Sequence, residues 1–237
     1  MQATTELEAL VEPSVHAPTA APRRRYWRGV QAVGMIAMVI LGANLAILGG
    51  HLWLRRSLPA PTVAVNVRNF HVVDEHLWRG AAPSDGALKA LAANGATTIV
   101  DLRAEDGLRV NEGLLVDEGL RRYHLPIRDG QSPSAKLVAE FLRIVDESDG
   151  PVYVHCGAGV GRTGTVVAAY LVSTARATPA QAVRHNLAVG PPSLEQLAFA
   201  AGIGAEIERP NPVIVGISRT LDAPRRMWVH IRGSYTR

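Results

Sequence analysis

Residues Val152 to Gly164 read Val-Tyr-Val-His-Cys-Gly-Ala-Gly-Val-Gly-Arg-Thr-Gly, and the rest of the predicted fold is built around them. Its opening residues, Val152 to Val154, are β-branched or aromatic and follow a Gly-Pro turn, which predicts a short buried strand. From Thr163 onwards the residues are mainly apolar, which predicts a helix. The loop between them therefore leads from the carboxyl end of a strand into the amino end of a helix.

This loop has the composition of an anion-binding site. At a helix N-terminus, free backbone N–H groups and the positive end of the helix dipole point into the preceding loop. Glycines let the backbone curl so that successive N–H groups face one centre, and an arginine offers a planar fork to two oxygens of a tetrahedral anion. The residues expected to bind phosphate in this way are Gly157, Ala158, Gly159, Val160, Gly161 and Arg162.

Cys156 is the only cysteine of the chain, which excludes an intrachain disulfide, and it lies at the base of this loop. Helix N-termini lower cysteine pKa values from about 8.5 towards about 3.5–7.5, so a thiolate is expected here. A thiolate facing a bound phosphoryl group is a nucleophile in position. The alternatives are an inert buried cysteine in a tight turn and a sulfur-transfer loop of the rhodanese type. His155 before the cysteine and Arg162 after it argue against both.

The pattern His-Cys-x5-Arg-Thr-Gly resembles the signature of the cysteine-based protein tyrosine and dual-specificity phosphatases, and the resemblance extends over residues 70–207. Residues 77–84 resemble the entry segment of the dual-specificity group. Residues 98–103 resemble its strand that ends in Asp-Leu-Arg. The resemblance implies hydrolysis of phosphate monoesters through a cysteinyl-phosphate intermediate that water later cleaves. No metal or other cofactor is expected.

The resemblance also implies a general acid on a separate loop upstream of the cysteine. Asp129 fits, because it lies in a turn after the predicted strand 123–127. It is followed by a helix that Ser132 is expected to cap, with Pro133 in its first turn. Asp106 is the second candidate, and an ordinary Asp-Gly turn is the alternative role for Asp129.

For four further residues the sequence leaves two possible roles each. The resemblance implies that His155 orients the loop backbone rather than shuttling protons. It implies that Thr163 hydrogen-bonds the sulfur, and the same residue could cap the helix. Arg103 either braces the loop through a carboxylate or is a solvated surface residue. Gln196 is expected on a helix surface, although some relatives place a water-positioning glutamine there.

Residues 29–54 contain no Asp, Glu, Lys or Arg, which predicts a transmembrane helix. These residues would reach ~39 Å as a helix, enough to cross a ~30 Å hydrocarbon core, and Trp27 and Trp53 would anchor the interfaces. A buried helix of a soluble protein is the alternative. A cleaved signal peptide is another, but its apolar region spans only ~7–15 residues.

The arginines around this segment predict its orientation. Arg23, Arg24, Arg25 and Arg28 precede it, whereas Arg55 and Arg56 follow it. This excess predicts a single-pass protein with its catalytic domain on the non-cytoplasmic side. A net charge of +4 and an arginine run beside an apolar stretch favour a membrane over nucleic acid as partner. The oligomeric state is left open.

The rest of the chain alternates between predicted strands and helices. Strands are expected at 63–73, 77–78, 98–102, 123–127 and 152–155, and helices at 84–94, 110–119, 133–147, 163–176, 178–188 and 193–207. This alternation predicts an α/β fold with a mainly parallel sheet and helices on both faces.

The expected organisation has five parts. They are a disordered basic tail at 1–28, the transmembrane helix at 29–54, a stiff linker at 55–62, the catalytic domain at 63–209 and a C-terminal extension at 210–237. In the extension, residues 213–217 and 227–231 are expected to pair as a hairpin.

The loop residues 157–161 include no lysine, which favours proteins carrying phosphotyrosine or phosphoserine/threonine as substrates. Relatives that act on phosphoinositides often carry lysines within this loop. A phosphatase for phosphoinositides or other non-protein phosphomonoesters is the first alternative. A non-catalytic phosphate-binding domain is the second.

Overall fold

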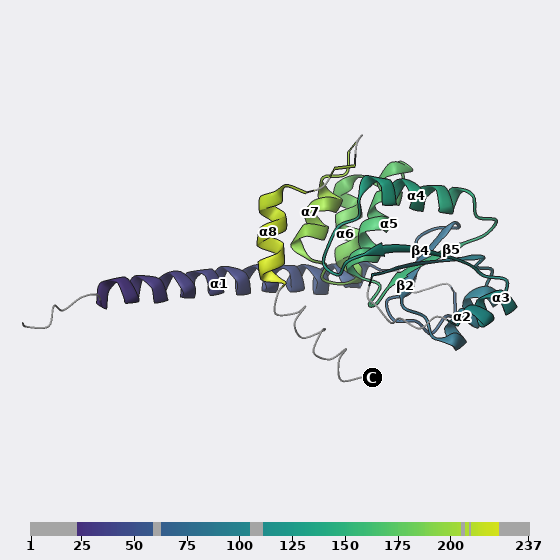
Figure 1. The fold of residues 1–237 in the computed structure, drawn as a ribbon, viewed down its shortest axis with the longest axis horizontal. Coiled ribbons are helices and arrows are strands. Elements are labelled where there is room, and N and C mark those ends of the chain that lie inside the picture. The colour runs from purple at the N-terminus through teal and green to yellow at the C-terminus, as the bar shows by residue number, and fades with distance from the viewer. Residues whose placement is uncertain (1–22, 59–62, 105–110, 205–206, 209, 223–237) are drawn as a thin grey trace, which may run out of the picture. The chain divides into compact units, whose positions relative to one another are not determined.

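The computed structural model describes residues 23–58, 63–104, 111–204, 207–208 and 210–222. Its centre is a five-stranded sheet in the order β1-β2-β5-β3-β4 (Figure 1). The strands are β1 (His71–Val72), β2 (Leu77–Ala81), β3 (Thr98–Arg103), β4 (Arg121–Ile127) and β5 (Val152–Cys156). Only β1 runs antiparallel to its neighbour, and the other three pairings are parallel. The predicted mainly parallel α/β fold is therefore confirmed.

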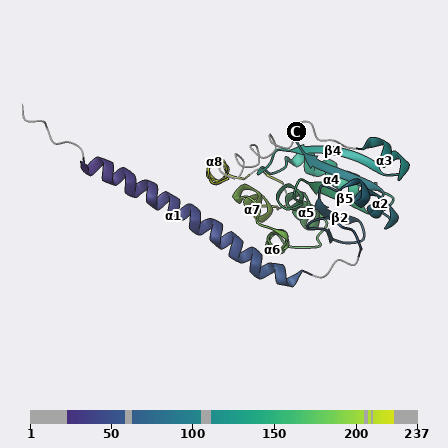
Figure 2. The ribbon, with the colours of Figure 1, turned by 90° about the horizontal axis from the view of Figure 1, so that it is seen from below.

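Helices cover both faces of this sheet (Figure 2). The described helices that follow β2 are α2 (Asp85–Ala93), α3 (Glu112–Asp117), α4 (Ala135–Asp146), α5 (Gly161–Ser173), α6 (Pro179–Val189), α7 (Leu194–Ala201) and α8 (Pro212–Leu221). Apolar residues of α4 and α5 pack against one face of the sheet, and those of α2 and α3 pack against the other. Helices α6 and α7 extend the first layer through a cluster that they share with α5.

The two cores follow from the alternation of side chains along each strand. In β5, Val152, Val154 and Cys156 belong to the core under α4 and α5, whereas Tyr153 belongs to the core under α2 and α3. Successive side chains of a strand point to opposite faces, so this division is the one that the pleat requires. As a result, the sulfur of Cys156 lies on the α5 side of the sheet.

The start of α4 differs from the prediction. Ser134, not Ser132, is its N-cap, and the Ser134 hydroxyl accepts a hydrogen bond from the N–H of Leu137. The helix therefore begins at Ala135. Ser132 instead donates both its N–H and its hydroxyl to Glu195, each at 3.0 Å, so it belongs to the turn before the helix.

The predicted hairpin in the C-terminal extension is wrong for its first half, because residues 212–221 form helix α8. Asn211 caps this helix by accepting the N–H of Val213 at 2.8 Å, and Pro212 occupies its first position. Both are strong helix-start signals and outweigh the strand preference of the β-branched residues that follow. The other half of the hairpin, 227–231, lies outside the described residues.

Helix α1 (Arg23–Leu54) contains the predicted membrane span and begins six residues before it. The segment Trp27–Ser57 has a mean hydropathy of 2.2 and is long and apolar enough to cross a bilayer. Apolar side chains along it, such as those of Val33, Met38 and Val39, are exposed. A signal segment near the N-terminus passes the same test of length and composition.

An ion-pair network links β3, β4 and β5 beside the predicted loop. The carboxylate of Asp101 is buried and receives two hydrogen bonds from the Arg103 guanidinium, at 2.9 and 2.8 Å, and one from the Arg103 backbone N–H, at 3.0 Å. Arg122 of β4 lies 3.3 Å from the same carboxylate, and the His155 ring lies 3.9 Å away. Burial by itself would raise the pKa of Asp101, but the hydrogen bonds and charges of its partners hold it well below its usual value. The network is therefore built around an ionised carboxylate.

We expect Asp101→Asn to lower the free energy of unfolding by about 3–5 kcal/mol at pH 7, because it removes the carboxylate from a buried ion pair. The stabilisation from a carboxylate with a depressed folded-state pKa is fully present above its unfolded pKa of about 3.9 and is lost as the pH falls towards the folded value. Urea unfolding should therefore show a constant difference between wild type and variant from about pH 7 to pH 5 that shrinks below about pH 4.

Glu140→Gln provides the matched control, because Glu140 forms an exposed ion pair with Arg143 at 2.6 Å. Exposed pairs contribute little, so this variant should unfold like the wild type. A difference for Asp101→Asn that is equally large at pH 3 and pH 7 would show that shape, not charge, is what the position requires.

Candidate active site

Cys156 ends β5, and α5 begins five residues later at Gly161, so the predicted strand, loop and helix are all present. The cysteine side chain is 3% exposed. The backbone N–H of Gly159 donates a hydrogen bond to its sulfur at 3.3 Å. A backbone donor directed at the sulfur, close to a helix N-terminus, stabilises negative charge on it.

Four consecutive carbonyl groups of the loop accept hydrogen bonds from outside it. The contacts are Ala82 N–H to Gly157 O (3.2 Å), Asn69 Nδ2 to Ala158 O (2.9 Å), Arg79 Nη2 to Gly159 O (2.8 Å) and Arg79 Nη2 to Val160 O (3.3 Å). Carbonyls turned outwards leave the loop N–H groups to line the inner side. The loop therefore has the form of an anion-binding nest.

Two glycines of the loop are required by close approach. Gly159 has a φ of +73°, and a Cβ there would overlap the backbone of Gly80 in β2. A Cβ on Gly161 would overlap the side-chain amide of Gln196. The loop is therefore pressed against β2 on one side and α7 on the other.

The structure brings Arg162 and Asp129 together, although 33 positions separate them in the sequence. The Arg162 guanidinium is 5% exposed, donates to the carbonyl of Ile127 at 3.2 Å and lies 3.5 Å from the Asp129 carboxylate. Asp129 is about one-third exposed, which places an accessible carboxylate beside the loop. Asp106, the second candidate for a general acid, lies outside the described residues.

Helix α7 holds the turn that carries Asp129. The three residues after Asp129 each form a hydrogen bond with the first turn of α7. Gly130 O accepts from the Ser193 hydroxyl (2.8 Å), Gln131 O accepts from Gln196 Nε2 (3.2 Å), and Ser132 donates to Glu195. The expectation that Gln196 lies on a helix surface is wrong, since it is 2% exposed. Its Oε1 caps the N–H of Ser193, so the capping box turns it inwards.

His155 lies beneath the loop and contacts its backbone. Its ring is 3% exposed, stacks on Tyr153 with 5.8 Å between centroids, and places Nδ1 3.3 Å from the carbonyl of Cys156. Burial lowers the pKa of His155 to about 4, although the charge of Asp101 opposes the shift. The ring is therefore neutral at pH 7 and faces the scaffold.

The remaining predicted residues divide into two cases. The Thr163 hydroxyl is buried and makes no hydrogen bond with the part of the chain that the structure describes. Its alternative role as a helix cap is wrong, because α5 already begins at Gly161 with Val160 at the cap position. The solvated alternative for Arg103 is also wrong, since this side chain is bound to the buried Asp101.

Arg79 adjoins the loop, and no feature of the sequence pattern assigned it a role. The one signal available was a charged residue inside the apolar strand segment Leu77–Ala81. Its side chain is fully buried, and it binds the two loop carbonyls described above.

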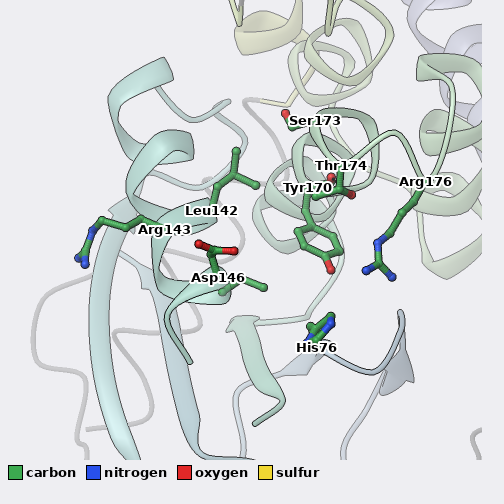
Figure 3. A pocket seen from close by; sticks show the side chains of 9 residues that line it. His76, Leu142, Arg143, Asp146, Tyr170, Ser173, Thr174 and Arg176 are labelled. Atoms are coloured by element: carbon green, nitrogen blue, oxygen red, sulfur yellow. Dashed lines mark hydrogen bonds between the residues drawn. The ribbon is translucent and has the colours of Figure 1, made fainter. Parts of the chain in front are cut away.

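A cavity of about 560 Å³ lies at the opposite edge of the sheet, where the strands begin (Figure 3). It is lined by His76, Leu142, Arg143, Val145, Asp146, Tyr170, Ser173, Thr174 and Arg176. Its arginines already have carboxylate partners: Arg176 lies 2.7 Å from Asp74, and Arg143 lies 2.6 Å from Glu140. This cavity therefore has neither an arginine that lacks a carboxylate partner nor, in contrast to the Cys156 loop, a cysteine.

Comparison with known proteins agrees with this geometry. The family model "DSP-PTPase phosphatase fused to NAD+ Kinase" matches residues 65–202. The dual specificity protein phosphatase CDC14C of Symphalangus syndactylus is 41% identical over 69 residues, which cover 27% of this chain and 14% of that protein. The probable NAD kinase 2, chloroplastic, of Oryza sativa subsp. japonica is 34% identical over 106 residues, which cover 42% of this chain and 11% of that protein.

Among solved structures, the core catalytic domain of the PP-IP phosphatase SIW14 from S. cerevisiae matches with a TM-score of 0.52 and 18% identity. The match covers 60% of this chain and 89% of that one, and it shows a shared fold. The family model spans more than half of the present sequence and includes the strand, loop and helix around Cys156. The chain therefore belongs to the DSP-PTPase family of cysteine-based phosphatases.

Proposed function

We propose that this chain is a membrane-anchored phosphatase that transfers the phosphoryl group of a phosphorylated protein first to Cys156 and then to water. The observation that carries the proposal is a sulfur with a backbone donor at 3.3 Å, at the base of a loop whose carbonyls face outwards. Such a loop stabilises both a thiolate and the negative charge on the oxygens of a phosphoryl group in transfer.

The first step forms a bond between Sγ of Cys156 and phosphorus while the bond from phosphorus to the substrate oxygen breaks. The loop N–H groups and Arg162 bind the non-bridging oxygens of the phosphoryl group. The departing oxygen takes its proton from the carboxylic acid of Asp129. This step leaves a cysteinyl phosphate and a free hydroxyl on the substrate.

The second step releases inorganic phosphate. Water attacks phosphorus, gives a proton to the Asp129 carboxylate, and the phosphorus–sulfur bond breaks to return the thiolate. The buried hydroxyl of Thr163 is available as a donor to the departing sulfur, since it makes no other hydrogen bond with the described residues. His155 supports the loop backbone from beneath in its neutral form.

The contact between Asp129 and Arg162 suits this cycle. The Asp129 carboxylate lies 3.5 Å from the Arg162 guanidinium, so the proposed acid is held beside the group that binds the phosphoryl oxygens.

The loop supplies positive charge for one phosphate group. Residues 157–161 carry no lysine or arginine, so a second phosphate on the same substrate gains nothing from this segment. This composition favours phosphotyrosine or phosphoserine/threonine of proteins over polyphosphorylated inositol compounds. Screening the enzyme against phosphopeptides, phosphoinositides and inositol phosphates tests the choice, and faster turnover of the inositol compounds would reject it.

We assign residues 29–54 as the membrane anchor and residues 63–209 as the catalytic domain. The arginine excess before the span supports a catalytic domain on the non-cytoplasmic side. Labelling of Cys156 in intact cells with a membrane-impermeant thiol reagent tests this orientation, because the chain has no other cysteine.

Cys156→Ser should lower kcat for p-nitrophenyl phosphate by on the order of 10³-fold or more, because a serine with no adjacent base is a poor nucleophile. The loop N–H groups and Arg162 remain in this variant, so calorimetry should still detect binding of tungstate, a phosphate analogue. Retention of about a tenth of the wild-type kcat would show that another group is the nucleophile.

Asp129→Asn should slow hydrolysis of a phosphotyrosine peptide by about 10²–10⁴-fold, the usual contribution of general acid catalysis. An aryl phosphate with a low-pKa phenol should lose much less, because its leaving group departs without a proton. The basic limb of the pH profile should flatten, and the acidic limb should persist. Equal losses on both substrates would instead indicate a structural turn, and Asp106 would be the next residue to replace.

Membrane attachment should depend on α1. The full chain should sediment with membranes and require detergent for release, whereas a fragment beginning at Pro61 should be soluble and hydrolyse p-nitrophenyl phosphate. The physical reason is that the apolar segment precedes every residue assigned to the site. If the fragment is recovered only as an inactive aggregate under mild conditions, α1 belongs to the catalytic fold.

A further inference from the structure

Arg79 is a charged residue in the interior of the molecule. It lies in β2, its relative exposure is 0%, and its Nη2 donates to the carbonyls of Gly159 and Val160 at 2.8 and 3.3 Å. Its Nε and Nη1 are buried and find no hydrogen-bond acceptor among the described residues. A guanidinium in this position is costly unless a negative charge compensates it.

The register of the sheet shows where that negative charge can arise. Arg79 lies opposite Val154 of the parallel neighbour β5, and Ala81 lies opposite Cys156. Leu77 of β2 and Val152, Val154 and Cys156 of β5 all belong to the core on the α5 side. Because side chains alternate along a strand, Arg79 lies on the same face as Leu77, and therefore on the face that carries the sulfur.

The titratable groups that interact electrostatically with Arg79 come from three surrounding elements. They are Cys156 and Tyr153 of β5, His71 of β1 and His185 of α6. No carboxylate of the described part of the chain forms an ion pair with it. Burial raises the pKa of Tyr153 far above neutrality and lowers the pKa values of both histidines, so all three are neutral at pH 7. Cys156, the nucleophile of the reaction proposed above, is the one group among them whose ionised form in that reaction is an anion.

The guanidinium itself stays charged. Burial lowers the pKa of Arg79 to about 10, and the negative charge at Cys156 opposes part of that shift. At neutral pH the site therefore holds a fixed cation behind the loop, on the side away from the substrate. Arg162, by contrast, lies at the rim beside Asp129, where the phosphate binds.

We propose that Arg79 is a positioning residue for the reaction: its guanidinium holds the carbonyls of Gly159 and Val160 away from the substrate, and its buried charge stabilises the Cys156 thiolate from behind. The inference rests on the proposed role of Cys156 as nucleophile and adds a second arginine to the site. It also accounts for a buried charge that no carboxylate among the described residues neutralises.

The test uses the single cysteine of the full-length chain. The rate of alkylation by iodoacetamide as a function of pH reports thiolate formation at Cys156 alone, since the chain has no other thiol. The measurement needs no substrate, so it stays informative even if the phosphatase reaction proposed above is wrong. The acidic limb of kcat/KM for p-nitrophenyl phosphate gives the same transition from activity.

Arg79→Met removes the charge and fills the space with an apolar chain of similar length. We expect a folded protein, because a well-packed apolar residue often replaces a buried charge without loss of stability. The alkylation midpoint and the acidic limb should both move to higher pH by about one unit, the lower end of the effect of a nearby opposite charge. A folded variant with both midpoints unchanged would overturn the proposal.

Arg79→Lys keeps a charge but replaces the fork with a single ammonium. It should retain a midpoint near that of the wild type while losing activity, since one point donor holds the two carbonyls less well. If Arg79→Met does not fold, Arg79→Lys alone tests the proposal. Wild-type kcat and KM in Arg79→Lys would show that the carbonyl contacts do not contribute to activity. An alkylation midpoint shifted by one pH unit in Arg79→Lys would show that the charge at position 79 does not stabilise the thiolate.

Asn69→Gly is the matched control. Asn69 also holds a loop carbonyl, that of Ala158 at 2.9 Å, but it is neutral and has a φ of +55°, a conformation that glycine adopts readily. Its replacement should weaken tungstate binding and lower kcat/KM without moving the alkylation midpoint. A shift as large as that of Arg79→Met would mean that loop geometry alone controls the thiolate, and the role assigned to the Arg79 charge would be wrong.

Discussion

The N–H groups of residues 157–161 can point to one centre only if the carbonyl groups of the same loop are bound on its outer side. The rest of the site depends on the hydrogen bonds that these carbonyls accept. The carbonyls of residues 157–160 are bound from behind by Asn69, Arg79 and the backbone of Ala82. Unsatisfied buried carbonyls would be costly, so these donors determine which way each peptide faces. The donor to the sulfur of Cys156 is a consequence of that arrangement.

The surrounding elements each hold one side of the loop. β2 supplies Arg79 and a close backbone contact at Gly80, α7 places Gln196 against Gly161, and the Asp101 network supports His155 from below. The same first turn of α7 binds residues 130–132, next to Asp129. The loop that holds Cys156 and the turn that carries Asp129 therefore share one support, and the described residues contain neither a disulfide nor a cluster of metal-ligating side chains.

Much of this could be read from local patterns. The run from Val152 to Gly164 predicts a strand, an anion-binding loop and a helix, because glycine spacing and apolar runs act within a few residues. Signals of the same kind failed where two local preferences competed. Residues 213–217 have the composition of a strand, but the Asn-Pro start at 211–212 began a helix. Ser132 is of a residue type that is favoured at helix N-caps, but the N-cap of α4 is Ser134.

The parallel sheet, the position of Cys156 and Arg162 around one loop, and an apolar segment long enough to cross a membrane all follow from the order of the residues. The identity of the distant residues that meet that loop follows from the folded chain. In the sequence, Arg79 is typical of a strand and Gln196 of a helix surface. In the structure, both side chains are buried against the loop. Their roles depend on strand register and helix packing, and these arise from the whole core and not from the residues nearby.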